Sequence, residues 1–335
     1  MFAIHSEKRN YLNSSTKSTN GRLSRICLIV TLLAAYSHVS TGVLSAQGKG
    51  SSSADEEKRT IRSLDGWPIA FTYYKPKSAG ENTPPVILLH KKNGNRLVWN
   101  KFAKRLQVQG YAVFAVDLRK HGESKLPAVG SNKKKKKRSS RSIDLKKQDY
   151  ERMVTRDLEG LKKFIVEEHQ AKKLNVRKMA IIAAQESAPI AINFAARDWT
   201  KRPHDDSARL QDKTPRGQDV RALVLLSPND KVPGISTGKS IGYLKSLRIA
   251  VFIAYGAQDT LDNKQSEKMF KKFSGAKGNN ERMELHKYSR VKYRGTDMLR
   301  LGGRIKLQEQ MLDFLNKHVK SLPDKWRDRR SRLRT

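Results

Sequence analysis

The sequence predicts an α/β protein built on a mostly parallel sheet, with an antiparallel hairpin at its start and helices on both faces. Short, continuous apolar runs carry this prediction, because strands that are buried on both faces of a parallel sheet have this composition. The runs are residues 84–90, 111–117, 178–184, 220–228 and 248–256. Segments with helical periodicity alternate with them, which is typical of a sheet covered on both sides.

The hairpin comes first, where residues 60–76 form two alternating segments around the turn residues Asp65 and Gly66. A last strand is expected at 283–290 and a last helix at 306–319. The other expected helices are residues 98–110, 150–168, 187–199 and 266–273. No internal repeat is present, so we expect one domain over residues 59–320.

The N-terminal residues resemble a secretory signal. A basic stretch is followed by the apolar run ICLIVTLLAAY at residues 26–36, which is too short for a comfortable membrane span. Small residues near Ala46 offer a cleavage site. We therefore expect residues 1–46 to be a signal peptide and the protein to be exported, to the periplasm, the cell surface or the medium. An uncleaved N-terminal anchor is the alternative.

Composition restricts both the chemistry and the partners. The only cysteine, Cys27, lies in the expected signal peptide, so the exported chain has no thiol for disulfides, thiolate catalysis or metal binding. The formal net charge of the 335 residues is +37, and removing residues 1–46 leaves +33. Such a charge favours polyanions, namely anionic polysaccharide, a membrane surface or nucleic acid. The basic stretches of the chain hold few aromatic residues, so we expect any nucleic-acid binding to be non-specific.

Four polar segments interrupt or flank the expected domain. Residues 47–58 form a Gly/Ser-rich segment that we expect to be a flexible linker. Residues 131–148 are expected to be a disordered basic insertion, residues 200–219 a polar insertion, and residues 321–335 a basic tail. The expected polyanion-binding residues are an unbroken run in the basic insertion: Lys133, Lys134, Lys135, Lys136, Lys137 and Arg138.

Three motifs stand at the ends of predicted strands, and in this order they resemble turns of the α/β-hydrolase family. LLHKKNGN at 88–95 matches the turn that supplies one oxyanion-hole amide, and VDLRKHGES at 116–124 matches D-x-R-G-H-G-x-S with Lys120 in place of a glycine. YGAQD at 255–259 matches the turn that presents the triad acid. The resemblance covers essentially the whole exported chain. It implies the α/β-hydrolase fold, with esterase- or peptidase-like relatives.

The nucleophile position falls in AAQESAP, at residues 183–189. In the family's G-x-S-x-G turn the residues two before and two after the nucleophile must be small. With Gln185 at the centre, these neighbours are Ala183 and Ser187, which are both small. With Ser187 at the centre, they are Gln185 and Pro189, which are bulky. We therefore place Gln185 at the nucleophile position, where its amide cannot attack a substrate.

The other catalytic positions are also degenerate. The loop at 289–303, where the family carries its histidine base, contains no histidine. Asp259 keeps the acid position, although an aspartate there can also cap a turn. In the oxyanion region, Lys91 takes the place of a glycine, and the amide of Glu186 lies at a helix N-terminus.

These observations lead to an exported pseudohydrolase with a binding or structural role. One alternative is an active ester or peptide hydrolase that uses Ser187, Asp259 and His286. Another is a scaffold that adheres to polyanions through its basic segments. No cofactor or metal is expected, because the histidines show no ligand spacing and no Gly-rich phosphate loop is present.

Overall fold

The structure is a computed structural model, which describes residues 55–127, 143–275 and 281–333. The chain divides into two units, Met1–Lys49 and Gly50–Thr335, and the described residues belong to the second. The expected signal peptide at 1–46 and the basic run from Lys133 to Arg138 lie outside the described residues.

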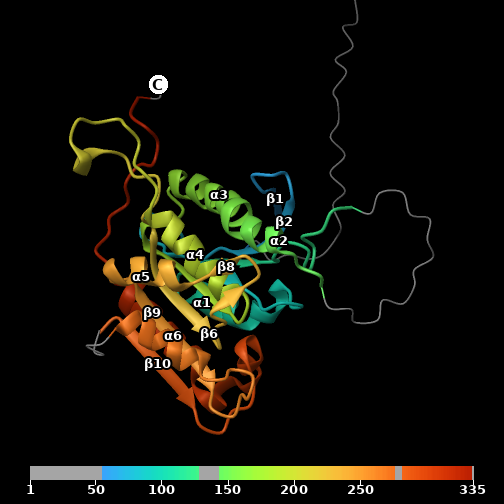
Figure 1. Cartoon of the computed structure of the whole chain (residues 1–335). Coiled ribbons are helices and arrows are strands. Elements are labelled where there is room, and N and C mark those ends of the chain that lie inside the picture. The colour runs from blue at the N-terminus through green and yellow to red at the C-terminus, as the bar shows by residue number, and fades with distance from the viewer. Residues whose placement is uncertain (1–54, 128–142, 276–280, 334–335) are drawn as a thin grey trace, which may run out of the picture. The chain divides into compact units, whose positions relative to one another are not determined.

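An eight-stranded sheet forms the centre of the domain, in the order β1-β2-β4-β3-β5-β6-β9-β10 (Figure 1). β1 pairs antiparallel with β2, and β2 pairs antiparallel with β4, whereas all other pairs are parallel. The predicted mostly parallel sheet with its N-terminal hairpin is therefore confirmed. The strands are β1 Glu56–Arg62, β2 Pro68–Tyr74, β3 Pro85–Leu89, β4 Ala112–Val116, β5 Met179–Ala184, β6 Val220–Leu226, β9 Ala250–Gly256 and β10 Met283–Tyr288.

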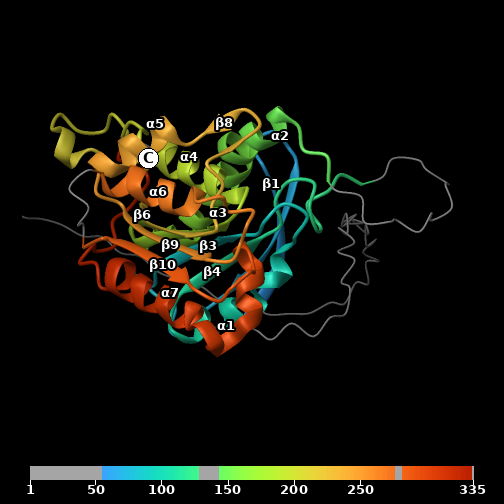
Figure 2. The same ribbon diagram turned by 60° about the horizontal axis from the view of Figure 1, so that its bottom comes forward.

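Helices cover both faces of the sheet (Figure 2). One face packs against α1 (Asn100–Val108) and α7 (Leu307–Leu315), which continues into a π-helical turn at Asn316–Lys320. The other face packs against α3 Leu158–Gln170, α4 Ser187–Trp199, α5 Gly238–Ser246 and α6 Gln265–Ser274. A short helix, α2 (Lys147–Arg152), and a π-helical turn at Met153–Asp157 lead into α3.

The apolar runs are buried because alternate side chains of each strand enter two separate cores. In β3, Ile87 and Leu89 belong to the core beneath α3 to α6, and Val86 and Leu88 belong to the core beneath α1 and α7. All four side chains are fully buried. Burial of apolar surface on both sides of the sheet is the main stabilising contribution here. Among the described residues, no helix is long and apolar enough to cross a membrane.

The structure corrects two boundaries and adds elements that the sequence did not predict. The end of the range 131–148, which we expected to be disordered, is ordered from residue 143, because Leu145 is buried in the core and α2 begins at Lys147. β1 begins at Glu56, inside the range 47–58 that we expected to be a flexible linker. Its residues pair one by one with β2, from Glu56 opposite Tyr74 to Arg62 opposite Pro68, and this pairing orders the polar segment. The added elements include the short hairpin of β7 (Lys231–Val232) and β8 (Ile235–Ser236), helix α5, and a 3-10-helical segment at Gly295–Ile305 after β10.

The basic tail is packed against the domain over its described part, up to residue 333. The indole of Trp326 stacks on His169 with ring centres 4.9 Å apart, and its Nε1 donates to the carbonyl of that residue at 2.8 Å. Arg327 donates to the carbonyls of Asp212 and Lys213 at 2.9 and 3.1 Å. The tail and the polar segment 200–219 therefore lie side by side at one end of α3 (Figure 1).

Candidate functional site

The turn between β5 and α4 places Gln185 in a strained backbone conformation. Its φ of 54° lies in the left-handed region, which a residue with a side chain adopts at a cost. Ala183 and Ser187, the residues two before and two after it, are fully buried. The Gln185 amide donates to the carbonyl of Leu226 at 3.0 Å, and its carbonyl accepts from Asn229 at 3.2 Å. The turn is thereby fixed to the end of β6.

The side chain of Gln185 is enclosed by the loop that follows β10. Its Nε2 donates to the carbonyl of Arg294 at 3.2 Å, and the residue is only 9% exposed. Gly295 has a φ of 57°, and a Cβ at this position would lie 2.5 Å from Nε2 of Gln185. The loop therefore needs a glycine to close over the glutamine amide.

Arg294 lies in the loop where the α/β-hydrolases, which the sequence resembles, carry their catalytic histidine. Its Nε is 3.5 Å from Oδ2 of Asp259, and its Nη2 donates to Oδ1 of Asn229 at 2.8 Å. A guanidinium has only donors and keeps its proton in proteins, so it cannot accept a proton from a nucleophile. The acid position is thus paired with a permanent cation and not with a base.

Asp259 also holds its own turn together. Its Oδ1 accepts from the amide of Leu261 at 3.0 Å, and its side chain is 3% exposed. Burial raises the pKa of this carboxyl, and the charge of Arg294 opposes the rise. The aspartate therefore has two structural roles, a turn cap and a counter-ion for Arg294.

The oxyanion region is occupied by side chains of the protein itself. Oε2 of Glu186 accepts from the amide of Lys92 at 3.2 Å, so a carboxylate lies against the turn that would supply an oxyanion amide. Nζ of Lys91 forms an ion pair with Asp297 from the loop after β10. An incoming carbonyl oxygen would have to displace the negatively charged Glu186 side chain before it could reach Lys92.

Solved structures of other proteins share this architecture, whereas comparisons of the sequence find no relative. No family model matches the chain, and no curated protein matches its sequence. Among solved structures, an esterase of Pyrococcus furiosus is similar with a TM-score of 0.51 at 16% identity, over 79% of this chain and 91% of that one. A proposed aryl esterase of Burkholderia cenocepacia has a TM-score of 0.50 at 13% identity, over 78% and 98%. The fold is that of the α/β-hydrolases. At these identities the likeness establishes the fold alone.

In this α/β-hydrolase fold, the alternative set of Ser187, Asp259 and His286 is not brought together. Ser187 is fully buried, where its Oγ bonds the backbone of Ala184 and the carbonyl of Leu89. Through the described part of the chain, no hydrogen bond or ion pair links the three residues.

His286 belongs to a different part of the α/β-hydrolase domain. Its ring stacks on Phe252 at 4.4 Å, and its Nε2 contacts Oε2 of Glu284 at 3.0 Å. Phe252 in turn contacts Phe314 of α7, so His286 lies on the α7 side of the sheet.

Two histidines of the hydrolase-like turns have structural roles. Nε2 of His90 accepts from the amide of Leu118 at 3.0 Å, and Nε2 of His121 accepts from the amide of Asn93 at 3.1 Å. Burial, and then the neighbouring His121, lower the pKa of His90 to about 4. His90 is therefore neutral at pH 7, and it joins the turns after β3 and β4.

Sequence reasoning missed Arg294, Asn229 and Gly295 as parts of this hydrolase-fold site. The signal for Arg294 and Gly295 was present in the loop at 289–303, which lacks histidine but places an arginine directly before a glycine. Within the described ranges, no cluster of histidine, cysteine or acidic residues could hold a metal ion.

Proposed function

We propose that the protein is an exported pseudohydrolase: an α/β-hydrolase-fold protein that does not hydrolyse esters or amides and acts by binding. The contact of Arg294 with Asp259 beside Gln185 carries this proposal. Hydrolysis by a serine-type triad needs a nucleophile, a base that accepts its proton and an acid that orients the base. In this protein the amide of Gln185 stands at the nucleophile position, and the guanidinium of Arg294 stands where the base would be.

The arrangement of the site supports loss of catalysis beyond these two substitutions. Glu186 accepts from the amide of Lys92, and the Lys91–Asp297 ion pair joins the oxyanion turn to the loop after β10. Gly295 leaves space for the Gln185 side chain, because a Cβ at residue 295 would lie 2.5 Å from Nε2 of Gln185. The site is packed around its substituted residues, as expected for a domain that keeps the fold for stability.

Export and anionic partners are parts of the same proposal. The signal-like residues 1–46 support export, and the net charge, which is +33 without those residues, supports a preference for polyanions. The basic run from Lys133 to Arg138 is the proposed contact for an anionic polysaccharide or membrane surface.

Activity-based labelling tests the pseudohydrolase directly. The purified exported chain is incubated with a fluorophosphonate probe and with short-chain p-nitrophenyl esters, beside an active esterase as a positive control. We expect no labelling and no ester turnover above the buffer rate. Labelling that disappears in Ser187→Ala would instead establish the active hydrolase alternative.

A further inference from the structure

A second candidate site lies on the opposite edge of the sheet from Gln185. A cavity of about 650 Å³ is bounded by α3, the 200–219 segment and the C-terminal residues 329–331. Asp219, which precedes β6, forms part of its wall, whereas Gln185 follows the neighbouring strand β5. Because β5 and β6 are parallel, the two sites lie at opposite strand ends. The volume is in the range of pockets that hold small organic ligands.

The base of this cavity is a buried cluster of charges. Nζ of Lys162 pairs with Asp198 and lies 2.6 Å from Oδ2 of Asp219. Asp219 also pairs with Arg329, and Lys201 lies 3.8 Å from Asp198. Three cations therefore face two carboxylates. All of these residues except Lys201 are more than nine-tenths buried.

The cluster has one cation more than it has carboxylates, and Glu159 neutralises this extra positive charge only in part. Glu159 contacts Lys201 at 2.5 Å but also pairs with Arg197 at 3.1 Å, so it is shared between two cations. Burial and the nearby charge of Lys162 lower the pKa of Lys201. Nε of Arg329 is buried without a hydrogen-bond acceptor. Each of these features would be relieved by an anion in the cavity.

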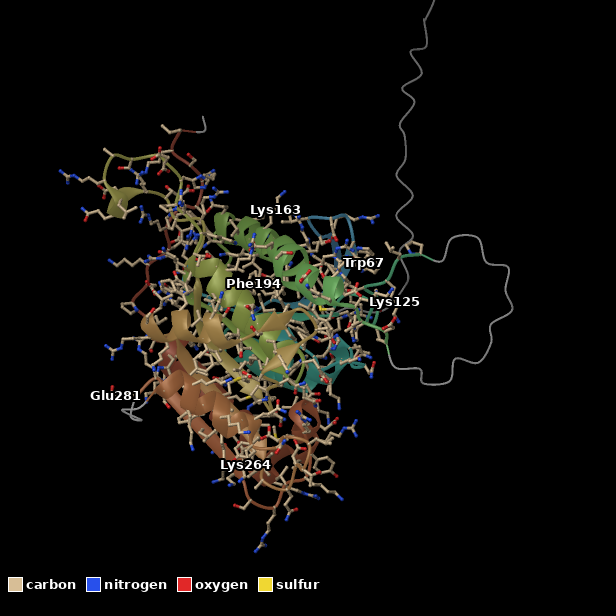
Figure 3. The ribbon with its side chains drawn as sticks, in the orientation of Figure 1. Trp67, Lys125, Lys163, Phe194, Lys264 and Glu281 are labelled. Carbon is tan, nitrogen blue, oxygen red and sulfur yellow. The ribbon has the colours of Figure 1, made fainter. Side chains whose placement is uncertain are left out.

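Two further cations lie at the mouth of the cavity, and in the described residues neither pairs with another side chain. Lys163 on α3 (Figure 3) and Arg216 of the polar segment are exposed. In the described ranges of the chain, neither forms a hydrogen bond or an ion pair with another side chain. In total, six lysine and arginine side chains line the cavity, against three carboxylates. Convergent cations of this kind prefer a multivalent oxyanion, which can accept several charge-assisted hydrogen bonds at once.

We propose that this cavity binds a small organic molecule that carries a phosphate or sulfate group beside an apolar group. Lys163 and Arg216 at the mouth and Lys201 inside would hold the anion. Val166 and Pro215, which also line the cavity, would contact the apolar part. The site is independent of the residues around Gln185, so it stands whether or not the protein hydrolyses esters.

Calorimetric titration at fixed ionic strength tests this proposal on the whole exported chain. The probes are inorganic phosphate, inorganic sulfate and phenyl phosphate, with sodium chloride as the blank. We expect saturable binding, tightest for phenyl phosphate because its ring covers the apolar wall. A preference for phosphate over sulfate, or the reverse, identifies which oxyanion the site prefers. Absence of saturable binding of all three probes overturns the proposal.

A matched pair of variants separates this site from the general basicity of the protein. Lys163→Ser/Arg216→Ser removes two exposed cations at the cavity mouth, and Lys268→Ser/Lys271→Ser removes two exposed cations on α6. We expect the first variant to bind phenyl phosphate about tenfold more weakly or worse, and the second to bind like the wild type. Equal weakening in both variants would show non-specific charge attraction and overturn the site. Unchanged thermal midpoints confirm that both variants are folded.

Discussion

Gln185 and Arg294 together determine what the site around the β5–α4 turn can do. The glutamine takes the strained turn position that a nucleophile occupies in α/β-hydrolases, and the arginine contacts Asp259 at the position of the triad acid. Strain of this kind is maintained only where the surroundings over-determine the backbone. Here the surroundings are the hydrogen bonds to Leu226 and Asn229 and the space left by Gly295.

Restoring the two substituted side chains tests this interpretation. We expect Gln185→Ser alone to remain unlabelled by a fluorophosphonate probe, because Arg294 cannot take the serine proton. The double variant Gln185→Ser/Arg294→His should react at least about 10²-fold faster than the single variant, since a positioned base contributes that much. Rates are measured by gel fluorescence against time. If the single variant reacts as fast as the double, Arg294 is not what prevents catalysis.

His90 predicts an acid sensitivity of the fold. Its pKa is about 4 in the folded protein and about 6.5 in the unfolded chain, so the unfolded chain binds the proton more readily. The stabilisation from neutral His90 is complete above pH 6.5 and is lost as the pH falls toward 4. Each pH unit in that window costs on the order of 1 kcal/mol.

Urea unfolding at pH 7 and pH 5 measures this effect. The His90→Leu variant should be less stable than the wild type at pH 7, because leucine cannot accept the hydrogen bond from the amide of Leu118. Its free energy of unfolding should nevertheless fall less between the two pH values. If both proteins lose the same free energy, His90 is not responsible for the acid sensitivity.

At the scale of helices and strands, α3 is bound to the rest of the domain by a buried lysine. Lys162 is 3% exposed and lies between Asp198 of α4 and Asp219 before β6. Burial lowers the pKa of Lys162, but the two carboxylates outweigh it, so the net change is upward and the lysine is charged. Removing one partner of a buried ion pair leaves the other charge buried and uncompensated. The free-energy cost of that charge exceeds the stabilisation that the intact pair provides.

Replacing this lysine should destabilise the domain strongly. We expect Lys162→Met to lower the free energy of unfolding by roughly 3–5 kcal/mol. The neighbouring exposed Lys163→Met should change it by less than about 0.5 kcal/mol. Adding Asp198→Asn to Lys162→Met should recover part of the loss. Urea denaturation gives these values, provided that the variants share the wild-type slope of unfolding free energy against urea concentration. Equal effects of the two lysine substitutions would contradict the prediction.

The elements differ in how far the sequence predicts them. The strands were predictable because burial on both faces makes them continuous apolar runs, as at 178–184. Helix α5 was not predicted, because Gly238 and Gly242 weaken its helical pattern. The contact of Arg294 with Asp259 joins two separate loops, and no local periodicity encodes such a contact.

At the scale of the whole molecule, the C-terminal segment is part of the fold. Arg329 is 8% exposed and donates to the carbonyls of Pro215 and Gly217 at 2.8 and 3.1 Å, in addition to pairing with Asp219. Arg327 and Arg329 of the basic tail therefore form hydrogen bonds and an ion pair within the domain. The sequence did not show this, because the partners are about a hundred residues away along the chain: Arg329 and Asp219 are 110 positions apart.

Removing the tail should therefore cost stability. We expect deletion of residues 323–335 to lower the thermal midpoint, and Arg329→Met to lose roughly 1–3 kcal/mol, because Asp219 and the carbonyls of Pro215 and Gly217 then lose a donor. Arg330→Met should be close to neutral, because Arg330 is exposed and, within the ranges that the structure describes, its one ion pair is with Asp328. Scanning calorimetry compares the four proteins. A deletion variant as stable as the full chain would show that the packed tail is dispensable.

Salt-dependent retention on heparin tests the proposed polyanion contact. Replacing Lys133–Arg138 by Gly/Ser should lower the eluting salt concentration more than replacing six dispersed cations, because a contiguous run releases counterions together. Equal shifts would remove any special role of the run. The control replaces six exposed lysines of the domain: Lys58, Lys101, Lys239, Lys268, Lys271 and Lys325.

The pairing of Arg329 with Asp219 also has a consequence for the order in which the chain matures. A chain that emerges from its N-terminal end presents α3 and β6 well before residue 329. Until then, Asp219 lacks its ion pair with Arg329, and the charge cluster that joins α3, α4 and the start of β6 is incomplete. The domain reaches its full stability only when the C-terminal segment arrives. For the export that we propose, this delay would keep the chain competent for transport until late in its synthesis.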